Sequence, residues 1–338
     1  MISESEDGLR DSTTHAGMDG ATDLVPFEAV EAAARVLDGH AVPTPFLLSP
    51  KLGDDVGGQV RLKLESLQRS GSFKFRGAFN FLAGYSQEAL AGGVVTYSSG
   101  NHAQAVALAA RLRGVDAVVV MPQTAPGVKR EGARALGARV VLEGTTSLER
   151  FERAREIQTA EGRLMVPPFD HPAIIAGQGT VALEAATAWP EMDTWVVCIG
   201  GGGLASGSGV SLRALQPEAR IIGVEPEGAA AMKASLDTGH PVTLDSVDTI
   251  ADGLAPVRPG DLTFHHVRRL FDEVVTVPDE AIRDAARWLL HEQKLVVEFS
   301  GAATVAALRH GVVDGTDRRV GAVVSGGNMD PSLLSGLL

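Results

Sequence analysis

Short apolar runs rich in β-branched residues alternate with helical patterns along most of this chain, and that alternation limits the fold more than any other feature. The runs are continuously apolar, which is typical of parallel strands buried on both faces. Segments such as "GVKREGARALG" and "SLERFERAREIQTAEG" supply helices between them. We therefore predict an α/β fold whose parallel sheets are covered by helices. The expected strands occupy residues 60–65, 94–98, 117–121, 139–142, 195–199, 221–225, 274–277 and 321–325.

Length and apolar content favour two lobes. The chain has 338 residues, of which 44% are hydrophobic, enough to bury a core of about two domains. The proline-rich segment "MVPPFDHP" at residues 165–172 suggests a crossover between lobes. We expect a small mobile lobe over residues 86–166 and a large lobe built from residues 25–85 and 167–338. Residues 1–24 are acidic and polar, and we expect them to form a mobile tail that is neither a signal nor a transit peptide.

Charge and cysteine content exclude several classes of function. A net charge of −12 argues against a general nucleic-acid binder and against a partner of anionic membranes. No apolar run is long enough to span a bilayer. Cys198, the single cysteine, lies in the apolar run "TWVVCIG", where we expect a strand-core residue instead of an exposed nucleophile. We predict a cytoplasmic protein with no nucleic-acid or membrane partner.

Three polar or glycine-rich turns, "SSGNHAQ", "GGGGL" and "SGGN", directly follow expected strands. Because ligands bind beyond the carboxyl ends of strands in open α/β sheets, we expect these turns on one rim. Ser98 or Ser99 can cap a helix whose free N–H groups would bind an anion such as a carboxylate. The four glycines Gly200–Gly203 allow the backbone to approach a phosphate closely.

A dinucleotide-binding fold is an alternative reading of the glycine turn. Gly200, Gly202 and Ala205 satisfy a loose G-x-G-x-x-G/A pattern, and Glu225 ends the next expected strand. The match is weak, and it lies two-thirds of the way along the chain, whereas a nicotinamide-binding domain usually opens with this pattern. An oxidoreductase therefore remains the rival hypothesis.

The segment "SGSFKFRGAFN" at residues 70–80 breaks a rule of helix electrostatics. Phe75, Ala78 and Phe79 have helical spacing, yet Lys74 and Arg76 lie in the first turn, at the positive end of the helix dipole. Such a conflict can indicate a functional site, although an ordinary surface lysine is the alternative.

Taken in order, "SGSFKFRGA", "SSGNHAQ", "PPFDHPAIIAGQGT", "GGGGL" and "SGGN" resemble the motifs of fold-type II pyridoxal-phosphate enzymes. Within that class the chain is most similar to threonine/serine dehydratases (threonine ammonia-lyases) and serine racemases, over roughly residues 25–335. The resemblance implies a fold like that of the tryptophan synthase β-subunit. Two lobes, each with a mostly parallel sheet covered by helices, would hold pyridoxal 5′-phosphate in the cleft between them.

The resemblance also implies a role for each matching residue. Lys74 corresponds to the lysine that forms the Schiff base, Asn101 to the partner of the cofactor 3′-oxygen, and Ser325 to the partner of the pyridine nitrogen. The other expected cofactor contacts are Phe73, the phosphate loop Gly200, Gly201, Gly202, Gly203 and Leu204, and Glu298, which we expect to face the cofactor from the sheet. The expected substrate-binding loop consists of Ser98, Ser99, Gly100, Asn101 and His102.

These roles predict β-elimination chemistry. A helix N-terminus and the neighbouring Arg76 would lower the pKa of Lys74 and favour its neutral, reactive amine. A serine at the pyridine nitrogen makes the cofactor a weaker electron sink than an aspartate would, which favours loss of a β-substituent over transamination. Lys74 would then remove the Cα proton and the β-hydroxyl would leave. The expected reaction converts L-threonine or L-serine into 2-oxobutanoate or pyruvate and ammonia.

Several alternatives stay open at this point. Ser99 matches the second base of serine racemases but is equally compatible with a helix cap, so a serine or aspartate racemase is possible. Phe299 stands where many relatives have proline, which leaves threo-3-hydroxyaspartate open as a substrate. A non-catalytic homologue that binds a small molecule is the alternative of another class.

Metal binding and assembly follow from the same resemblance. Metal-activated relatives carry a Glu and an Asp six residues apart, but here Glu225 is followed by Ala231. We expect no divalent cation, with Glu225 as the single candidate ligand. We expect a homodimer or homotetramer, and no C-terminal regulatory domain of the kind found in many biosynthetic threonine dehydratases.

Overall fold

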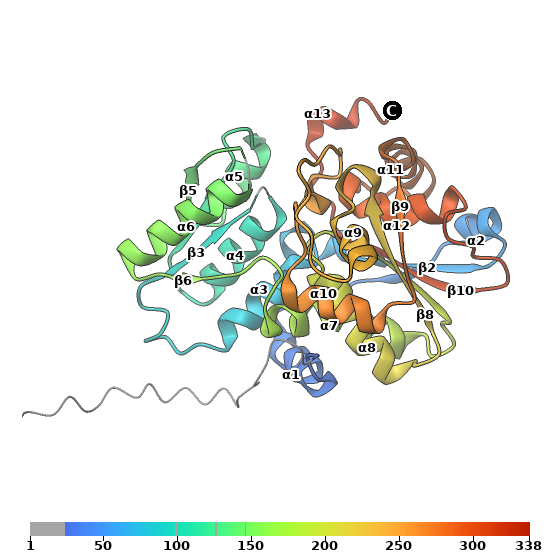
Figure 1. Ribbon diagram of the computed structural model, residues 1–338, viewed down its shortest axis with the longest axis horizontal. Coiled ribbons are helices and arrows are strands. Elements are labelled where there is room, and N and C mark those ends of the chain that lie inside the picture. Colours follow the sequence, from blue (N-terminus) through green and yellow to red (C-terminus); the bar gives the residue numbers. More distant parts are fainter. Residues whose placement is uncertain (1–23, 99, 126, 146) are drawn as a thin grey trace, which may run out of the picture.

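The computed structural model describes residues 24–98, 100–125, 127–145 and 147–338. Its strands form two separate sheets, which lie in the two halves of the molecule in Figure 1. Apart from Leu24, the expected N-terminal tail lies outside the described residues. Ser99, the candidate second base, lies outside them as well.

The larger sheet has six strands in the order β1-β2-β10-β7-β8-β9. Every neighbouring pair is parallel except β1 and β2. The last strand of the chain, β10, lies between β2 and β7, so the centre of this sheet joins segments far apart in sequence. The strands are β1 (Phe46–Leu48), β2 (Gln59–Leu64), β7 (Thr194–Cys198), β8 (Arg220–Pro226), β9 (Glu273–Val277) and β10 (Arg319–Val324).

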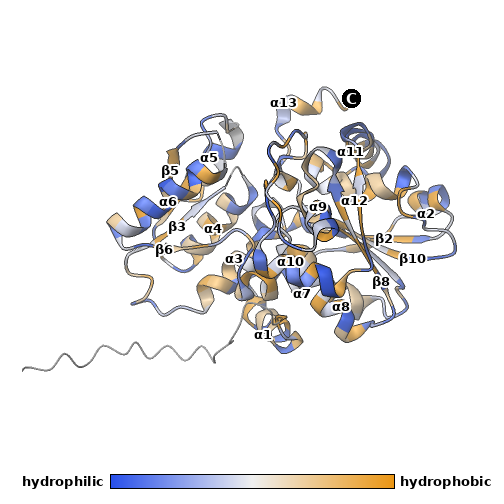
Figure 2. Ribbon diagram, viewed as in Figure 1, coloured by the Kyte–Doolittle hydropathy of each residue, from blue (hydrophilic) through white to orange (hydrophobic). Residues whose placement is uncertain are grey.

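Helices pack on both faces of this sheet, which explains why its central strands consist mainly of apolar residues. Helix α12 packs across β7, β8, β9 and β10, with α11 and α2 against it, while α8 packs on β7 with α7 and α10 beside it. All five residues of β7 are buried. Figure 2 accordingly shows apolar residues along β8, whereas the outer helices carry hydrophilic residues. These helices are α2 (Pro50–Val56), α7 (Pro172–Ala188), α8 (Gly203–Leu215), α10 (Asp261–Leu270), α11 (Asp279–Gln293) and α12 (Phe299–Arg309).

The smaller sheet has four parallel strands in the order β5-β4-β3-β6. Its central strand β4 is fully buried between α4 and α6, which both pack on it. We call this sheet and its helices the small lobe, and the rest of the described chain the large lobe. The elements of the small lobe are β3 (Val94–Tyr97), α4 (Asn101–Leu112), β4 (Ala117–Met121), α5 (Gly127–Ala135), β5 (Arg139–Leu142), α6 (Ser147–Glu161) and β6 (Leu164–Met165).

The remaining helices connect or flank the sheets. Helix α3 packs on both α4 of the small lobe and α7 of the large lobe, so it lies where the lobes meet. Its neighbour α1 packs on α7 and α8. The bounds are α1 (Phe27–Leu37), α3 (Lys74–Ala83), α9 (Ala231–Thr238) and α13 (Pro331–Leu334), and short 3₁₀ turns include η1 (Glu65–Leu67) and η4 (Asp252–Leu254).

The α/β class with mostly parallel sheets is confirmed, and all eight expected strands form within two residues of their expected bounds. Sequence reasoning missed β1 and β6, which have three and two residues. Runs this short carry no periodic signal. The proposed lobe boundaries at residues 86 and 166 stay a prediction.

Candidate active site between the lobes

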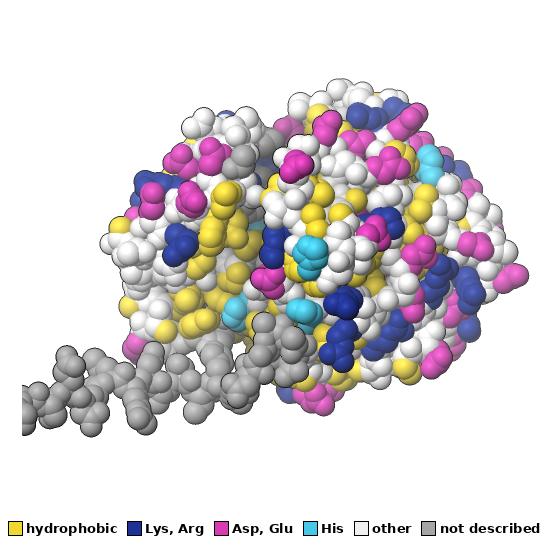
Figure 3. Space-filling view, in the orientation of Figure 1, with side chains coloured by type: hydrophobic (Ala, Val, Ile, Leu, Met, Phe, Trp, Pro, Cys, Tyr) yellow, Lys and Arg dark blue, Asp and Glu magenta, His cyan; other side chains and the backbone are white. Residues whose placement is uncertain are grey.

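A cavity of about 550 Å³ lies between the two lobes, within the usual size range of small-molecule sites. Figure 3 shows hydrophobic side chains gathered along the furrow between the lobes, while charged side chains are scattered over the rest of that face. The three predicted turns all line the cavity. They do not share one rim, however: the turn after β3 comes from the small lobe, and the turns after β7 and β10 face it from the large lobe.

Backbone pairing holds the start of α3 against the chain that follows β10. Ser72 forms an antiparallel bridge with Gly326, and the Phe73 N–H donates to the carbonyl oxygen of Ser325 at 3.1 Å. Helix α3 begins at the next residue, Lys74. This isolated β-bridge brings Lys74, the predicted cofactor lysine, close to Ser325, the predicted partner of the pyridine nitrogen.

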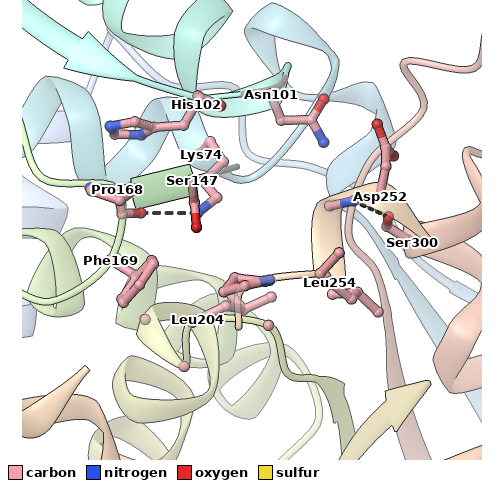
Figure 4. Close-up of a pocket in the computed structure, with 18 of the residues that line it drawn as sticks. Lys74, Asn101, His102, Ser147, Pro168, Phe169, Leu204, Asp252, Leu254 and Ser300 are labelled. Atoms are coloured by element: carbon pink, nitrogen blue, oxygen red, sulfur yellow. Dashed lines mark hydrogen bonds between the residues drawn. The ribbon is translucent and has the colours of Figure 1, made fainter. Parts of the chain in front are cut away.

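The Lys74 side chain points into the cavity. Its Nζ donates to the carbonyl oxygen of Pro168 at 2.9 Å, as the dashed line in Figure 4 shows, and lies 5.3 Å from the centre of the Phe73 ring. Burial lowers the pKa of Lys74 from 10.5 to about 8. Lys74 is therefore not an ordinary surface lysine, and about a tenth of its amine is neutral at pH 7, far more than for a solvated lysine.

Arg76 does not cause this pKa shift, contrary to expectation. Its guanidinium is buried and pairs with Glu65 at 2.8 Å and Glu184 at 2.6 Å, so nearby carboxylates balance its charge. Burial, and not the neighbouring cation, accounts for the lowered pKa of Lys74.

The glycine loop forms a cradle that side chains would fill. Gly202 has a φ of 92°, a conformation that favours glycine. A Cβ on Gly201 would lie 2.2 Å from Cδ1 of Phe169, and one on Gly200 would lie 3.0 Å from the Gly253 carbonyl oxygen. Helix α8 starts directly after Gly202 with no side-chain cap among the described residues, which leaves its first N–H groups available to an anion. Leu204 in the first turn also lines the cavity.

Asn101, the first residue of α4, is oriented by two partners from the large lobe. Its Nδ2 donates to Glu298 Oε1 at 2.5 Å, and its Oδ1 accepts from Asn328 Nδ2 at 2.9 Å. Asn328 in turn donates to the carbonyl oxygen of Ser70 at 2.8 Å. The amide of Asn101 is therefore fixed where the resemblance places a contact with the cofactor.

Glu298 lines the cavity from the residue directly before α12, not from the sheet as expected. The reason is local: the apolar residues around it belong to a loop and a helix start, not to a strand. Burial raises its pKa to about 7, although nearby Lys129 opposes the shift. Its Oε2 is buried with no hydrogen-bond partner in the described chain, so a ligand could supply one.

Ser325 follows β10 and lines the cavity next to Cys198, the last residue of β7. Burial raises the pKa of the Cys198 thiol to about 11, although Ser325 partly opposes the shift, so the thiol stays protonated. The expectation that Cys198 is a buried strand residue is met. Sequence reasoning missed its place in the cavity, which its position directly before the glycine turn could have indicated.

The substrate loop is described except for Ser99. Ser98 Oγ accepts from the Gly100 N–H at 3.1 Å. His102 is buried, with Nε2 3.3 Å from the Val166 carbonyl oxygen, and burial together with the Lys74 charge lowers its pKa to about 3. A neutral His102 adds no charge, so among the described residues of this loop the N–H groups at the start of α4 and the Ser98 hydroxyl can bind a carboxylate.

Arg150 is a cavity residue that sequence reasoning missed. It lies in α6 and is 9% exposed, and burial lowers its pKa. Its Nη1 donates to the Thr145 carbonyl oxygen at 3.2 Å, whereas its buried Nε has no partner in the part of the chain that the structure describes. Arg150, Ala154 and Ile157 are the buried residues of α6. An arginine on that buried stripe is the signal that could have identified it.

The candidate metal ligand Glu225 has another role. It is fully buried, and its two carboxylate oxygens accept from the N–H groups of Met232 and Lys233, both at 2.8 Å, at the start of α9. Burial raises its pKa to about 7. In the described ranges no three His, Cys, Asp or Glu side chains are grouped so that they could hold a metal ion. Glu225 is thus a helix cap in this structure.

These features define a class of protein: a two-lobed α/β enzyme that holds an anionic, lysine-linked cofactor between its lobes. A partly neutral lysine amine, an anion cradle and a buried carboxylate with one unpartnered oxygen all fit pyridoxal phosphate. Residues 37–326 match the family described as pyridoxal-phosphate dependent enzyme, and the chain belongs to this family.

The chain is similar to proteins of known name over most of its length. The L-threonine ammonia-lyase of Thermotoga maritima is 42% identical over 315 residues, 93% of this chain and 78% of that protein. The L-threo-3-hydroxyaspartate ammonia-lyase of a Pseudomonas species is 40% identical over 93% of this chain and 99% of that protein. Maize serine racemase superposes with a TM-score of 0.89 at 37% identity, covering 93% of this chain and 97% of that one.

The predicted fold-type II architecture, the predicted cofactor and the relationship to ammonia-lyases and serine racemases are thereby confirmed. The cofactor places this chain among enzymes and removes the case for a nicotinamide-dependent oxidoreductase. As for membranes, none of the helices within the described ranges combines the length and apolar character needed to cross a bilayer.

Proposed function

We propose that this protein is a pyridoxal-phosphate-dependent dehydratase (ammonia-lyase) that removes water and ammonia from L-threonine, L-serine or both, giving 2-oxobutanoate or pyruvate. One observation carries the proposal: the amine of Lys74 lies in a cavity that also contains an anion cradle and the Ser325 hydroxyl. When bound, pyridoxal phosphate supplies a carbonyl that links to amines and a ring that stabilises negative charge at Cα. The side chains and backbone of the protein bind and orient the reactants and transfer the proton.

Lys74 is the proton acceptor in this proposal. With a pKa of about 8, its amine is neutral in a useful fraction of molecules at neutral pH and can take the Cα proton. The Pro168 carbonyl oxygen orients Nζ from the crossover segment. An amine held in this way is a better base than a solvated lysine, which is almost fully protonated at pH 7.

The other residues bind and orient. Gly200–Gly203 and the start of α8 hold the phosphate, and the start of α4 holds the substrate carboxylate. Ser325 would face the pyridine nitrogen of the bound cofactor with a hydroxyl, which does not release its proton at neutral pH. The charge at Cα is then less delocalised, which favours loss of the β-hydroxyl over transamination.

Threo-3-hydroxyaspartate is the second candidate substrate, and Arg150 favours it. Arg150 lines the cavity, and a guanidinium at the wall of a site can receive a second carboxylate. The similarity to an enzyme named L-threo-3-hydroxyaspartate ammonia-lyase supports this substrate. Racemisation of serine or aspartate would need Ser99, which lies outside the described residues.

The first test is chemical. Protein loaded with pyridoxal phosphate should be yellow, lose its visible band on borohydride reduction and retain the label on Lys74 after peptide mapping. Lys74→Ala should abolish formation of 2-oxo acid. More than a trace of dehydratase activity in this variant would refute the assignment, and a colourless protein that ignores added cofactor would refute the enzyme class.

The second test separates the substrates. We expect Arg150→Gln to lower kcat/KM for L-threo-3-hydroxyaspartate by about 10-fold or more and to change that for L-threonine by less than about 3-fold, because only the former loses a charge-assisted contact. Arg153→Gln is the matched control, since Arg153 lies on the exposed side of α6 and pairs with Glu156. Equal losses for both substrates would exclude a carboxylate-binding role for Arg150.

Assembly and compartment belong to the same proposal. We propose a homodimer or homotetramer in the cytoplasm. Light scattering coupled to size-exclusion chromatography of the loaded protein would measure the subunit number.

A further inference from the structure

Two residues after Lys74, Arg76 belongs to a cluster of four charged side chains, of which three are buried and Glu184 is partly buried. Arg76 is 1% exposed and contacts two carboxylates with both edges of its guanidinium. Nε and Nη2 lie 2.8 Å from the two oxygens of Glu65, and Nη1 and Nη2 lie 2.6 and 3.0 Å from the two oxygens of Glu184. The fourth member, Lys63, contacts Glu184 at 2.5 Å.

The cluster is electrically balanced. Arg76 and Lys63 supply two positive charges, and Glu65 and Glu184 supply two negative ones. The carboxylates raise the pKa of Arg76, and the cations hold the pKa of Glu65 below its usual value despite burial. Because the charges cancel locally, the cluster does not act on the Lys74 amine through its field. Any effect of the cluster on Lys74 must therefore come from the position in which it holds the first turn of α3.

The geometry joins three elements at the base of the site. Glu65 directly follows β2, Glu184 lies in α7, and Arg76 lies in the first turn of α3. Residues two apart on a helix point about 200° apart, so Arg76 faces this cluster while Lys74 faces the cavity. The described chain supplies no side-chain cap to the start of α3. Arg76 is therefore the side chain that ties this turn to both β2 and α7.

We infer that Arg76 is a positioning residue for Lys74: by bridging Glu65 and Glu184 it sets the rotation of the first turn of α3 and hence the direction of the lysine amine. The inference rests on the proposed role of Lys74. An arginine is needed because only a planar guanidinium can meet two carboxylates bidentately at once. A lysine keeps the charge of the cluster but not the bidentate contacts.

The decisive variant is Arg76→Lys in the full chain. We expect the visible band to form at least about 10-fold more slowly when cofactor-free protein is mixed with pyridoxal phosphate. We also expect kcat to fall by about 10-fold or more, with KM changed by less than about 3-fold. In Arg76→Ala, millimolar guanidinium should restore part of the linkage rate, because the free ion can occupy the vacated position.

A matched control separates positioning from stability. Arg213→Lys alters another arginine with several partners, which binds Asp272 and three backbone carbonyls in the large lobe. We expect it to lower the melting temperature without changing the rate of cofactor linkage. Glu184→Gln is the second test variant, because Glu184 is only partly buried and one side of the bridge is weakened without removing Arg76.

The outcomes are distinguishable. If wild-type protein does not link the cofactor at Lys74, the proposed function fails. If wild type links it normally and Arg76→Lys links it at the wild-type rate with unchanged kcat, the inference about Arg76 is wrong. Should Arg76→Lys not fold, Glu184→Gln decides: a linkage rate slowed several-fold supports positioning, and a rate equal to that of Arg213→Lys overturns it.

Discussion

Protonation at the cavity wall is set by burial more than by neighbouring charge. At pH 7, His102 with a pKa of about 3 is neutral and Cys198 with a pKa of about 11 is a thiol. Lys74 and Glu298, with pKa values of about 8 and 7, are the cavity groups that titrate near neutrality. In the protein without cofactor, a change of pH between 6 and 9 therefore changes the charge of these two cavity side chains, besides that of the buried Glu225 outside the cavity.

The pKa of Lys74 predicts how cofactor loading depends on pH. At pH values below the Lys74 pKa of about 8, the ammonium form dominates, and it has no lone pair with which to attack the cofactor. The linkage rate should therefore rise about 10-fold per pH unit up to pH 8 and level off above it. Stopped-flow absorbance of cofactor-free protein mixed with pyridoxal phosphate between pH 6 and 10 would measure this. A model amine such as N-acetyl-lysine amide is the control, since its rate should keep rising to about pH 10.5. The same late rise in the protein would mean that the Lys74 amine is not buried.

Among the elements, the glycine loop Gly200–Gly203 packs closely against Phe169 of the crossover segment. A Cβ on Gly201 would collide with the Phe169 ring, so Gly201→Ala should weaken pyridoxal-phosphate binding by about 10-fold or more. Phe169→Ala should restore part of that loss in the double variant, because it removes the colliding ring. Equilibrium dialysis of all three variants would measure the coupling, with Gly127→Ala as a control where the nearest atom to a Cβ, Arg130 Nη2, lies 4.0 Å away. Strictly additive losses would contradict a direct clash.

Sequence patterns predicted these elements unequally, and the reason is physical. Strands such as β4 and β7 are buried on both faces and are therefore continuously apolar. Strand β1 is an antiparallel edge strand with two exposed leucines, Leu47 and Leu48, so its three residues show no such run. Glu298 was placed in the sheet because apolar residues flank it, although these residues belong to a loop and to α12. Apolar composition does not distinguish those cases over four or five residues.

The positions of Lys74, Gly200–Gly203 and Ser325 could be predicted because each lies at a strand end or helix start with a recognisable turn. The buried stripe of α6 only hints at Arg150, and no local pattern indicates Asp252, which lines the cavity from a short 3₁₀ turn of the large lobe. Likewise, the facing of two sheet rims across the cavity depends on lobe placement, which local patterns do not encode. The pairing of Arg76 with Glu65 and Glu184 is a long-range contact of the same kind.

For the molecule as a whole, an ion pair beside the cavity is one of the contacts that join the two lobes. Lys129 of α5 in the small lobe contacts Asp252 of η4 in the large lobe, and Asp252 lines the cavity. The Lys129 side chain is buried against Gly100 of the substrate loop. The same pair therefore joins lobe closure to the loop that would hold the substrate carboxylate.

We expect Lys129→Met to raise KM by about 3- to 10-fold with a smaller change in kcat, because the closed arrangement loses an attractive contact while the methionine keeps most of the packing volume. Adding Asp252→Asn should change KM little further, since the pair is already broken. Arg220→Met is the control, because Arg220 pairs with Glu273 within the large lobe. Steady-state kinetics of the two single variants, the double variant and the control would test this. Fully additive effects on KM would show that the two side chains act independently.

The centre of the six-stranded sheet is completed by a strand that is made long after its two neighbours. Strands β2 and β7 are made long before β10, which separates them, and until residues 319–324 emerge both have an unpaired edge facing the same gap. The four strands of the small lobe, by contrast, lie within residues 94–165 and can pair as soon as they are made. During synthesis the chain therefore carries a finished small lobe beside an open large one, and Ser325 reaches the cavity only when that gap closes. The ability to bind cofactor therefore depends on a strand made long after its neighbours, which makes it a marker of the closed large lobe.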